Sequence, residues 1–205
     1  MENKSDKELI AFYNVENLFS PDLPRNHKLD PTFSGLQNWD ERKYQNKLFK
    51  IAQVFQLILE SENSLPMLIG ISEVQGNQPL EELVKLEPFN SNYGIVHYES
   101  MDERGVDVAL LYDKSKIEVI SSEPISYLFA VESKNTEYYD TTRDVLFCKI
   151  KYFETVMNVF VLHLKSKREK DVNKPKREYI LRDLHQKISN LVINEKEGVI
   201  ICGDF

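Results

Sequence analysis

Four apolar segments of this chain each end in a polar side chain whose chemistry suits a metal ion or a phosphate group. The polar residues are Asn14, Glu73, His163 and Asp204, and they end or follow Leu9–Val15, Leu68–Ile71, Val156–Leu164 and Val199–Cys202, respectively. Segments this apolar are typical of strands that are buried on both faces. An unpaired carboxylate or amide inside such a strand would cost on the order of several kcal/mol. At strand ends the four groups can meet at one edge of a sheet, where α/β folds place their ligands, so we predict a site there.

Two long helical patterns and a series of short apolar segments must position these side chains. Apolar residues recur at helical spacing from Tyr44 to Glu60 and from about Arg177 to Asn194, which predicts a helix over each range. A short helix is predicted over Leu80–Leu86, after Pro79. The other predicted strands are Tyr93–Tyr98, Val106–Tyr112, Lys116–Ile120, Ile125–Phe129 and Val145–Tyr152. Many of these strands are expected to be antiparallel, which predicts an α/β fold with sheets packed on each other and helices outside.

Two polar segments are predicted to be loops that shape the site. Ser20–Asp40 contains three prolines and is too long for a simple connection, and Ala130–Asp140 is strongly charged. Asp102–Gly105 is predicted to form the turn of a hairpin between two strands. The basic stretch Lys165–Lys176 is typical of a solvated run of charge, although its first residues follow His163 closely.

Composition bounds the function classes. With 205 residues and a mass of 24.0 kDa, the chain is long enough for one domain with a substantial core. The formal net charge of −7 argues against tight, metal-free binding to a polyanion. A metal-dependent phosphoesterase remains compatible with this charge, because such a site gathers carboxylates to hold a cation that then meets the phosphate.

Cysteine spacing and hydropathy bear on zinc binding, membrane insertion and cellular location. Cys148 and Cys202 lie in apolar segments without the spacing of a zinc site, so buried free thiols are predicted. No stretch approaches the roughly 20 apolar residues of a membrane span. The polar first residues show no signal peptide, so a cytoplasmic location is expected.

The motifs around the four polar residues resemble those of the endonuclease/exonuclease/phosphatase superfamily. The similar motifs are Tyr-Asn-Val-Glu-Asn-Leu-Phe around Asn14, Ile-Ser-Glu-Val-Gln around Glu73, Leu-His-Leu-Lys-Ser around His163, and the final Gly-Asp-Phe that contains Asp204. Each motif is short, but their order, spacing and place at strand ends match together over essentially the whole chain. The resemblance implies a single domain over residues 1–205 with a deoxyribonuclease-like α/β/β/α sandwich: two packed, mostly antiparallel sheets with outer helices.

The resemblance also implies a role for each of the four residues. Glu73 matches the glutamate that binds Mg²⁺ or Mn²⁺, and Asn14 matches a residue that positions both metal and phosphate. His163 matches a histidine beside the scissile phosphate, and Asp204 an aspartate that positions the attacking water. The alternatives are a helix-capping or surface glutamate, an Asx turn at Asn14, and a histidine whose hydrogen bonds are satisfied within the core.

Three further residues are candidates for the site. Asp107 is predicted to accept a hydrogen bond from His163, which would fix the tautomer of the imidazole; the alternative is a surface-facing strand position. Arg143 matches an arginine near the phosphate, and a guanidinium suits bidentate phosphate binding. The alternative for Arg143 is a salt bridge with Asp140 or Asp144. Lys165 is predicted to steer phosphate toward the site.

The sequence departs from the superfamily pattern at its end. After Phe205 the expected asparagine is absent, as are later strands and the Ser-Asp-His motif that supplies the general base in relatives. We expect the chain to be a fragment of a longer protein; the alternative is a catalytically impaired member.

The predicted function is hydrolysis of a phosphodiester or phosphomonoester by in-line attack of water. Within this class, we expect a nuclease, with DNA as its substrate. An inositol or lipid phosphatase of the same superfamily and a non-catalytic binding or scaffold protein are the alternatives. The oligomeric state is not legible from the sequence.

Overall fold

Two stacked sheets form the centre of the molecule. The computed structural model describes residues 7–21, 39–102, 105–131, 138–167 and 171–205. The first sheet has the order β1-β2-β4-β3, built from β1 (Ile10–Leu18), β2 (Leu68–Val74), β3 (Tyr93–His97) and β4 (Asp107–Asp113). The second has the order β10-β9-β8-β5, built from β5 (Ile117–Ile125), β8 (Val145–Tyr152), β9 (Thr155–His163) and β10 (Gly198–Asp204).

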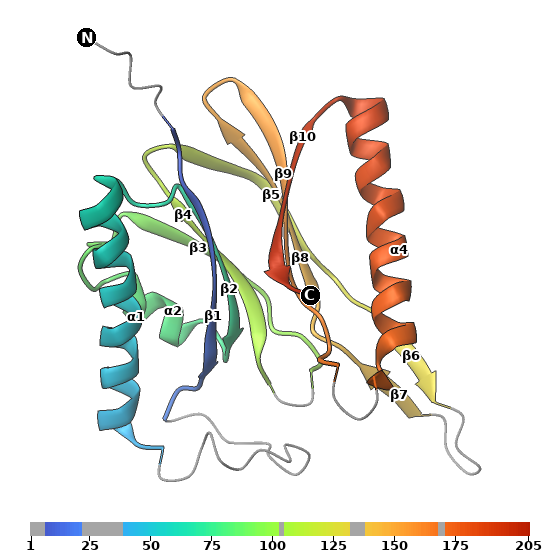
Figure 1. Cartoon of the computed structure of the whole chain (residues 1–205), viewed down its shortest axis with the longest axis horizontal. Coiled ribbons are helices and arrows are strands. Elements are labelled where there is room, and N and C mark those ends of the chain that lie inside the picture. The colour runs from blue at the N-terminus through green and yellow to red at the C-terminus, as the bar shows by residue number, and fades with distance from the viewer. Residues whose placement is uncertain (1–6, 22–38, 103–104, 132–137, 168–170) are drawn as a thin grey trace.

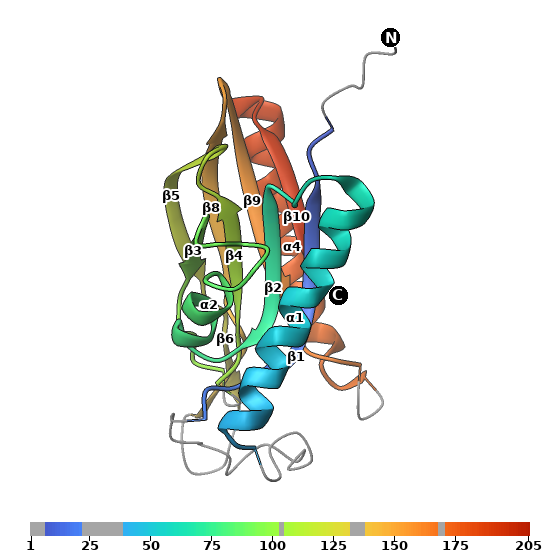
Figure 2. The same cartoon turned by 90° about the vertical axis from the view of Figure 1, so that its left-hand side faces the viewer.

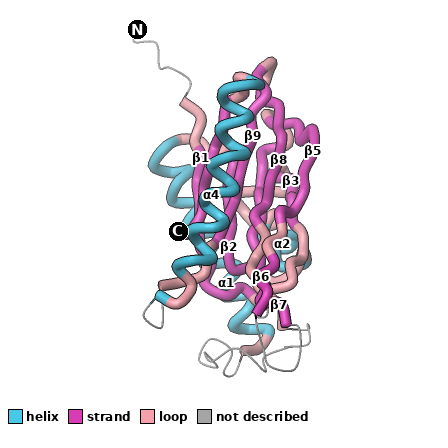
Figure 3. Tube along the Cα trace, turned by 90° about the vertical axis from the view of Figure 1, so that its right-hand side faces the viewer, coloured by secondary structure: helices cyan, strands magenta, loops and turns pink. Residues whose placement is uncertain are grey.

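One helix covers the outer face of each sheet, so the layers are α/β/β/α (Figure 1). Figure 2 shows α1 (Glu41–Glu62) across the first sheet, with the short α2 (Gln78–Leu83) beside it. Figure 3 shows α4 (Lys174–Asn190) over the second sheet; its last turn continues as a π-helix, Leu191–Glu195. A further hairpin of β6 (Leu128–Val131) and β7 (Tyr138–Thr141) lies beyond the N-terminal end of α4. The predicted sandwich is confirmed.

Three apolar layers hold the sandwich together. Leu48, Ile51 and Phe55 of α1 pack against the first sheet, and Ile180 and Leu184 of α4 pack against the second. Between the sheets, side chains of β2 and β4 meet side chains of β8 and β9, among them Leu68, Leu110, Cys148 and Val161. Burial of these side chains is the main stabilising contribution to the fold, at roughly 25 cal/mol per Å² of apolar surface removed from water.

The sheets are mixed, and the parallel pairs explain where the site forms. β1 runs parallel to β2 and β9 runs parallel to β10, while the other neighbours are antiparallel. Parallel neighbours bring their carboxyl ends to the same edge of a sheet. β10 also contacts both β1 and β2 across the sandwich. The two parallel pairs therefore bring their carboxyl ends toward one another.

Helix boundaries follow capping residues that periodicity alone does not show. The side chain of Asp40 accepts a hydrogen bond from Lys43 N at 2.8 Å, so α1 begins three residues before the predicted Tyr44. It ends at Asn63, a left-handed residue whose N–H donates to Leu59 O at 2.9 Å. α4 begins at Lys174, with Pro175 in its first turn, where a proline is favoured.

The strand predictions were wrong between Lys116 and Asp140. Lys116–Ile120 and Ile125–Phe129 were expected as two strands, whereas β5 is continuous from Ile117 to Ile125 and contains Pro124. β5 lies at the edge of its sheet, where a proline is tolerated, and a register shift between Val119 and Ser121 absorbs the irregularity.

The two predicted loops have different outcomes. Ala130–Asp140 was expected to be a loop, but its ends belong to the β6–β7 hairpin. Most of the Ser20–Asp40 loop lies outside the described residues, as do the two central residues of the predicted turn Asp102–Gly105.

Candidate functional site

Bulges at the ends of β1 and β2 set the directions of two site residues. Asn14 pairs with Ser72, and the register then shifts between Asn14 and Leu18 on one strand and between Ser72 and Val74 on the other. Glu73 occupies the second bulge with a left-handed backbone, φ 66°. A bulge redirects a side chain that regular pleating would place on one face of the sheet, and here it turns Glu73 toward the second sheet.

His163 and Asp204 come from the facing sheet as direct partners in the register of β9 and β10. The backbone holds this pairing at its end, because Leu164 N donates to Asp204 O at 2.9 Å. The last residues of both strands therefore present an imidazole and a carboxylate side by side.

The structure brings together Asn14, Glu73, His163 and Asp204. Asn14 Nδ2 donates to Glu73 Oε1 at 3.3 Å and to Asp204 Oδ2 at 3.1 Å. His163 Nε2 lies 3.6 Å from Glu73 Oε1 and 3.9 Å from Asp204 Oδ2. The side chains of His163 and Glu73 are 8% and 14% exposed, whereas that of Asp204 is 51% exposed. The site thus has a buried floor and opens to solvent beside Asp204.

The orientation of Asn14 decides what its side chain can do. Its Oδ1 accepts a hydrogen bond from Glu16 N at 2.8 Å, which is the Asx turn weighed as an alternative from the sequence. The amide NH₂ therefore faces the two carboxylates, and its oxygen faces its own backbone. In this arrangement Asn14 donates to both carboxylates, and its expected role as a metal ligand stays a prediction.

The donor set fits a hard divalent cation better than zinc. The described residues contain no group of three or more His, Cys, Asp or Glu side chains placed to hold a metal ion, as a structural or catalytic zinc would require. Mg²⁺ keeps several waters and needs only one or two carboxylates, which Glu73 and Asp204 offer. Ser72 Oγ, just before Glu73, is buried without a hydrogen-bond partner in the described structure, so it is a group that a metal-bound water could satisfy.

Lys47 of α1 also reaches the site, and the sequence analysis did not identify it. Its Nζ donates to Glu16 O, and its side chain is partly buried. Burial lowers the pKa of Lys47, while the negative charges of Glu16 and Glu73 act in the opposite direction. The available signal was its helical position: Lys47 follows Tyr44 by three residues and precedes Ile51 by four, within the apolar stripe of α1.

Asp107 does not pair with His163 as predicted. Its Oδ1 accepts hydrogen bonds from Ser100 N at 3.0 Å and from Ser100 Oγ. Its Oδ2 lies 3.7 Å from Nε2 of His97, whose side chain is buried. Asp107 begins β4, directly after the segment that contains Ser100, so donors near in the chain hold its carboxylate. The carboxylates facing His163 are instead those of Glu73 and Asp204.

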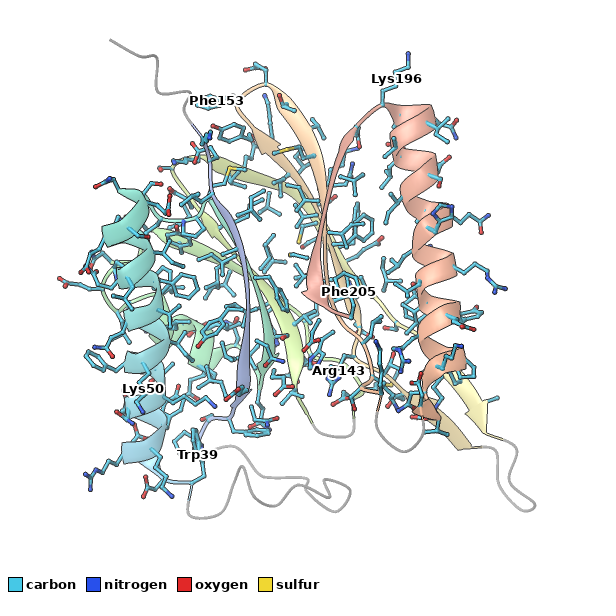
Figure 4. All side chains as sticks on the ribbon, in the orientation of Figure 1. Trp39, Lys50, Arg143, Phe153, Lys196 and Phe205 are labelled. Carbon is cyan, nitrogen blue, oxygen red and sulfur yellow. The ribbon has the colours of Figure 1, made fainter. Side chains whose placement is uncertain are left out.

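Arg143 and Lys165 have carboxylate neighbours of their own. Arg143 is buried, with Nε 3.9 Å from Asp102 Oδ2, a residue that the sequence analysis did not weigh beside Asp140 and Asp144. Lys165 Nζ lies 2.6 Å from Asp140 Oδ1, and Lys176 Nζ binds the other oxygen of the same carboxylate. Figure 4 shows Arg143 between the two sheets, on the side toward the β6–β7 hairpin. Their predicted phosphate contacts stay predictions.

Comparison with known proteins identifies the family. The profile described as "Endonuclease/Exonuclease/phosphatase family" matches residues 9–205. The chain belongs to this family. At the level of sequence, no curated protein matches the chain.

Several solved structures have a similar fold over nearly the whole length of this chain. TDP2 of D. rerio, in complex with single strand DNA product, is 19% identical with a TM-score of 0.59, and the match covers 97% of this chain and 61% of that one. A mannosyl-6-phosphatase of Bacteroides thetaiotaomicron is 14% identical with a TM-score of 0.59, covering 97% and 65%. An endonuclease/exonuclease/phosphatase from Bacteroides vulgatus is 19% identical with a TM-score of 0.55, covering 95% and 64%. The chain thus spans about three fifths of the length of the TDP2 chain.

Among the described residues, no helix has the length and apolar character needed to cross a membrane.

Proposed function

We propose that this family member is a divalent-metal-dependent phosphoesterase that hydrolyses a phosphate ester by in-line attack of water. The observation that carries the proposal is the meeting of two carboxylates, an amide and an imidazole at one solvent-open edge: Glu73, Asp204, Asn14 and His163. These are the groups needed to hold a cation, orient a phosphate and handle a proton.

Glu73 would hold the cation, with the carboxylate of Asp204 beside it. When Mg²⁺ or Mn²⁺ is bound, it supplies Lewis-acid polarisation of a phosphoryl oxygen. The carboxylates of Glu73 and Asp204 share the amide of Asn14 as a donor, and two negative charges this close repel each other. A bound cation would offset that repulsion.

The other side chains act on the phosphate and the water. Asn14 Nδ2 is a donor whose direction is fixed by its own Asx turn, and its two N–H groups are directed at Glu73 and Asp204. Once a carboxylate turns to the cation, the N–H that it accepted can hydrogen-bond a phosphoryl oxygen. His163 Nε2 faces the same space and can donate to the oxygen on which charge develops. Asp204 is the exposed member, so its carboxylate is the group that can accept a hydrogen bond from the attacking water.

Nucleic acid is the substrate class that we propose first. The TDP2 of similar fold is in complex with single strand DNA product. The exposed side of the site at Asp204 would let a phosphodiester enter from solvent. The equally similar mannosyl-6-phosphatase makes a phosphomonoester the second candidate. A panel of single-stranded DNA, duplex DNA, a hexose 6-phosphate and inositol phosphates, each with Mg²⁺, separates these classes by the product released.

Metal binding tests the proposal without the need for a substrate. Calorimetric titration with Mg²⁺ and Mn²⁺ compares the parent chain with Glu73→Gln and with Glu118→Gln, an exposed glutamate on β5 that serves as the control. We expect Glu73→Gln to weaken affinity by about tenfold or more, because it removes the charge of a ligand while keeping its shape, and Glu118→Gln to leave it unchanged. Equal affinities for all three proteins would overturn the assignment of Glu73.

A further inference from the structure

Lys47 connects the helical layer to the irregular end of β1. It lies on α1, and its Nζ donates to the backbone carbonyl of Glu16. The same ammonium lies 5.8 Å from the centroid of the Trp39 ring, within the range of a cation–π contact. These contacts place an ammonium group at a position where the stripe of α1 is otherwise apolar.

The segment that Lys47 holds has an unusual backbone. Glu16 and Asn17 both have left-handed conformations, φ 55° and 62°, within the register shift between Asn14 and Leu18. Residues with a side chain disfavour this region, and they keep it only where surrounding contacts determine it. An ammonium bound to the carbonyl of Glu16 is such a contact.

Three donors from the described part of the chain bind carbonyls of this segment. Lys47 binds Glu16 O, Gln75 N donates to Leu18 O at 3.0 Å, and Trp39 Nε1 donates to Phe19 O at 3.0 Å. The backbone of β2 and the indole therefore hold the later residues. Lys47 alone among these three acts on the residue nearest the site.

Glu16 is also the residue that orients Asn14. Glu16 N donates to Asn14 Oδ1 at 2.8 Å, and this bond leaves Asn14 Nδ2 facing Glu73 and Asp204. The carbonyl that Lys47 binds belongs to the Glu16–Asn17 peptide, whereas the N–H that binds Asn14 belongs to the Val15–Glu16 peptide. The two peptides share the Cα of Glu16, so a change in the backbone angles of Glu16 would release Asn14 Oδ1 and free the amide to turn. Lys47 therefore acts on the amide through a single intervening residue.

We propose that Lys47 is a positioning residue: by holding the carbonyl of Glu16, it fixes the direction in which Asn14 presents its amide to Glu73 and Asp204. This inference deepens the proposed function, since it concerns the same site and assigns the orientation of its phosphate donor to α1. It does not require Lys47 to touch metal or substrate.

The direct test is nuclear magnetic resonance of the Asn14 side-chain amide. In ¹⁵N-labelled protein, the two Nδ2 protons of a fixed amide give separate signals with slow exchange, and Asn14→Ser identifies those signals. Lys47→Met removes the donor, Lys47→Arg retains one, and Lys50→Met changes an exposed lysine of the same helix as control (Figure 4). We expect Lys47→Met to shift the Asn14 signals and speed their exchange with solvent about tenfold, and the other two variants to leave them in place.

Mg²⁺ affinity provides the second readout. Loss of a residue that orients groups around a metal weakens binding by about 10-fold in typical cases, so Lys47→Met should show this loss and Lys50→Met should not. A circular dichroism melt checks that each variant folds; if Lys47→Met does not fold, Glu16→Gly, which adopts the left-handed conformation freely, is combined with it and tested by the same signals.

The outcomes separate this inference from the function. Asn14 signals that are unchanged in folded Lys47→Met protein overturn the positioning role, whatever the metal does. Shifted signals in a protein that binds no Mg²⁺ even in its parent form support the positioning role and overturn the proposed phosphoesterase.

Discussion

Gly70 of β2 lies directly against Cys202 of β10: a methyl group added at Gly70 would come within 2.7 Å of Cys202 Sγ. The same methyl group would meet Phe12 at 3.0 Å and Val161 at 3.2 Å. The two sheets therefore lie close together three residues before Glu73 on one strand and two residues before Asp204 on the other. Close approach at this point is what allows side chains of the two sheets to share one site.

We predict that Gly70→Ala destabilises the protein and weakens the site. The added methyl group has no room, and overpacking of this kind typically costs about 1–3 kcal/mol. Separating the sheets would also move Glu73 away from His163 and Asp204, so Mg²⁺ affinity should fall. Chemical denaturation measures the free energy of unfolding, and calorimetry measures the affinity.

Gly198→Ala is the matched control for this change. Gly198 lies on β10, the partner strand of the contact, and its added methyl group would meet Met157 at 3.4 Å, an ordinary contact. Unaltered stability and metal affinity in Gly70→Ala would show that the sheets can separate without cost, and would contradict the role given to this contact.

The sequence predicted the strand ends well because buried strands impose strong patterns. β8 has the predicted bounds, Val145–Tyr152, and the polar residues that follow the apolar segments meet as expected. Parallel pairing of strands with stacked sheets is enough to bring such ends together, and neither feature requires knowledge of individual contacts.

Contacts within the site were harder to predict because they depend on competition among neighbours. Asp107 has a donor seven residues earlier, in Ser100, and this local partner replaces the long-range one. Lys47 occupies a helical position where an apolar side chain is the usual expectation, so periodicity alone gives no reason to assign it to a site. The direction of the Asn14 amide depends on one backbone N–H, which no sequence pattern reports.

The two cysteines, Cys148 buried and Cys202 partly buried, predict a loss of stability at alkaline pH. Burial raises the pKa of Cys148 to about 12 and that of Cys202 to about 11. Above a pH of about 9, the unfolded chain releases these protons while the folded protein retains them. The contribution of the thiols to the free energy of unfolding should therefore be complete below that pH. It should fall by about 1.4 kcal/mol per pH unit for each thiol as the pH rises toward 11.

A Cys148→Ala/Cys202→Ala double variant isolates this effect. Burial also raises the pKa values of Tyr93 and Tyr127, but they contribute equally to parent and variant. Urea denaturation from pH 8 to pH 11 should give a steeper decline for the parent than for the variant. Parallel curves would mean that the thiols ionise as easily in the folded protein as in the unfolded chain.

His163→Gln should separate turnover from metal binding. His163 Nε2 faces both carboxylates, yet nitrogen is a poor ligand for Mg²⁺, so the imidazole is assigned to the phosphate. Loss of a group that transfers or shares a proton in the transition state typically lowers turnover by about 10²–10⁴-fold. With the substrate that the panel identifies, we expect a fall in kcat of that order, KM within about threefold, and unchanged Mg²⁺ affinity by calorimetry. His185→Gln, at an exposed position of α4, is the control and should match the parent in all three quantities.

A His163→Gln variant with parental kcat would remove the imidazole from the mechanism, whereas one that loses Mg²⁺ binding would make His163 part of the metal site.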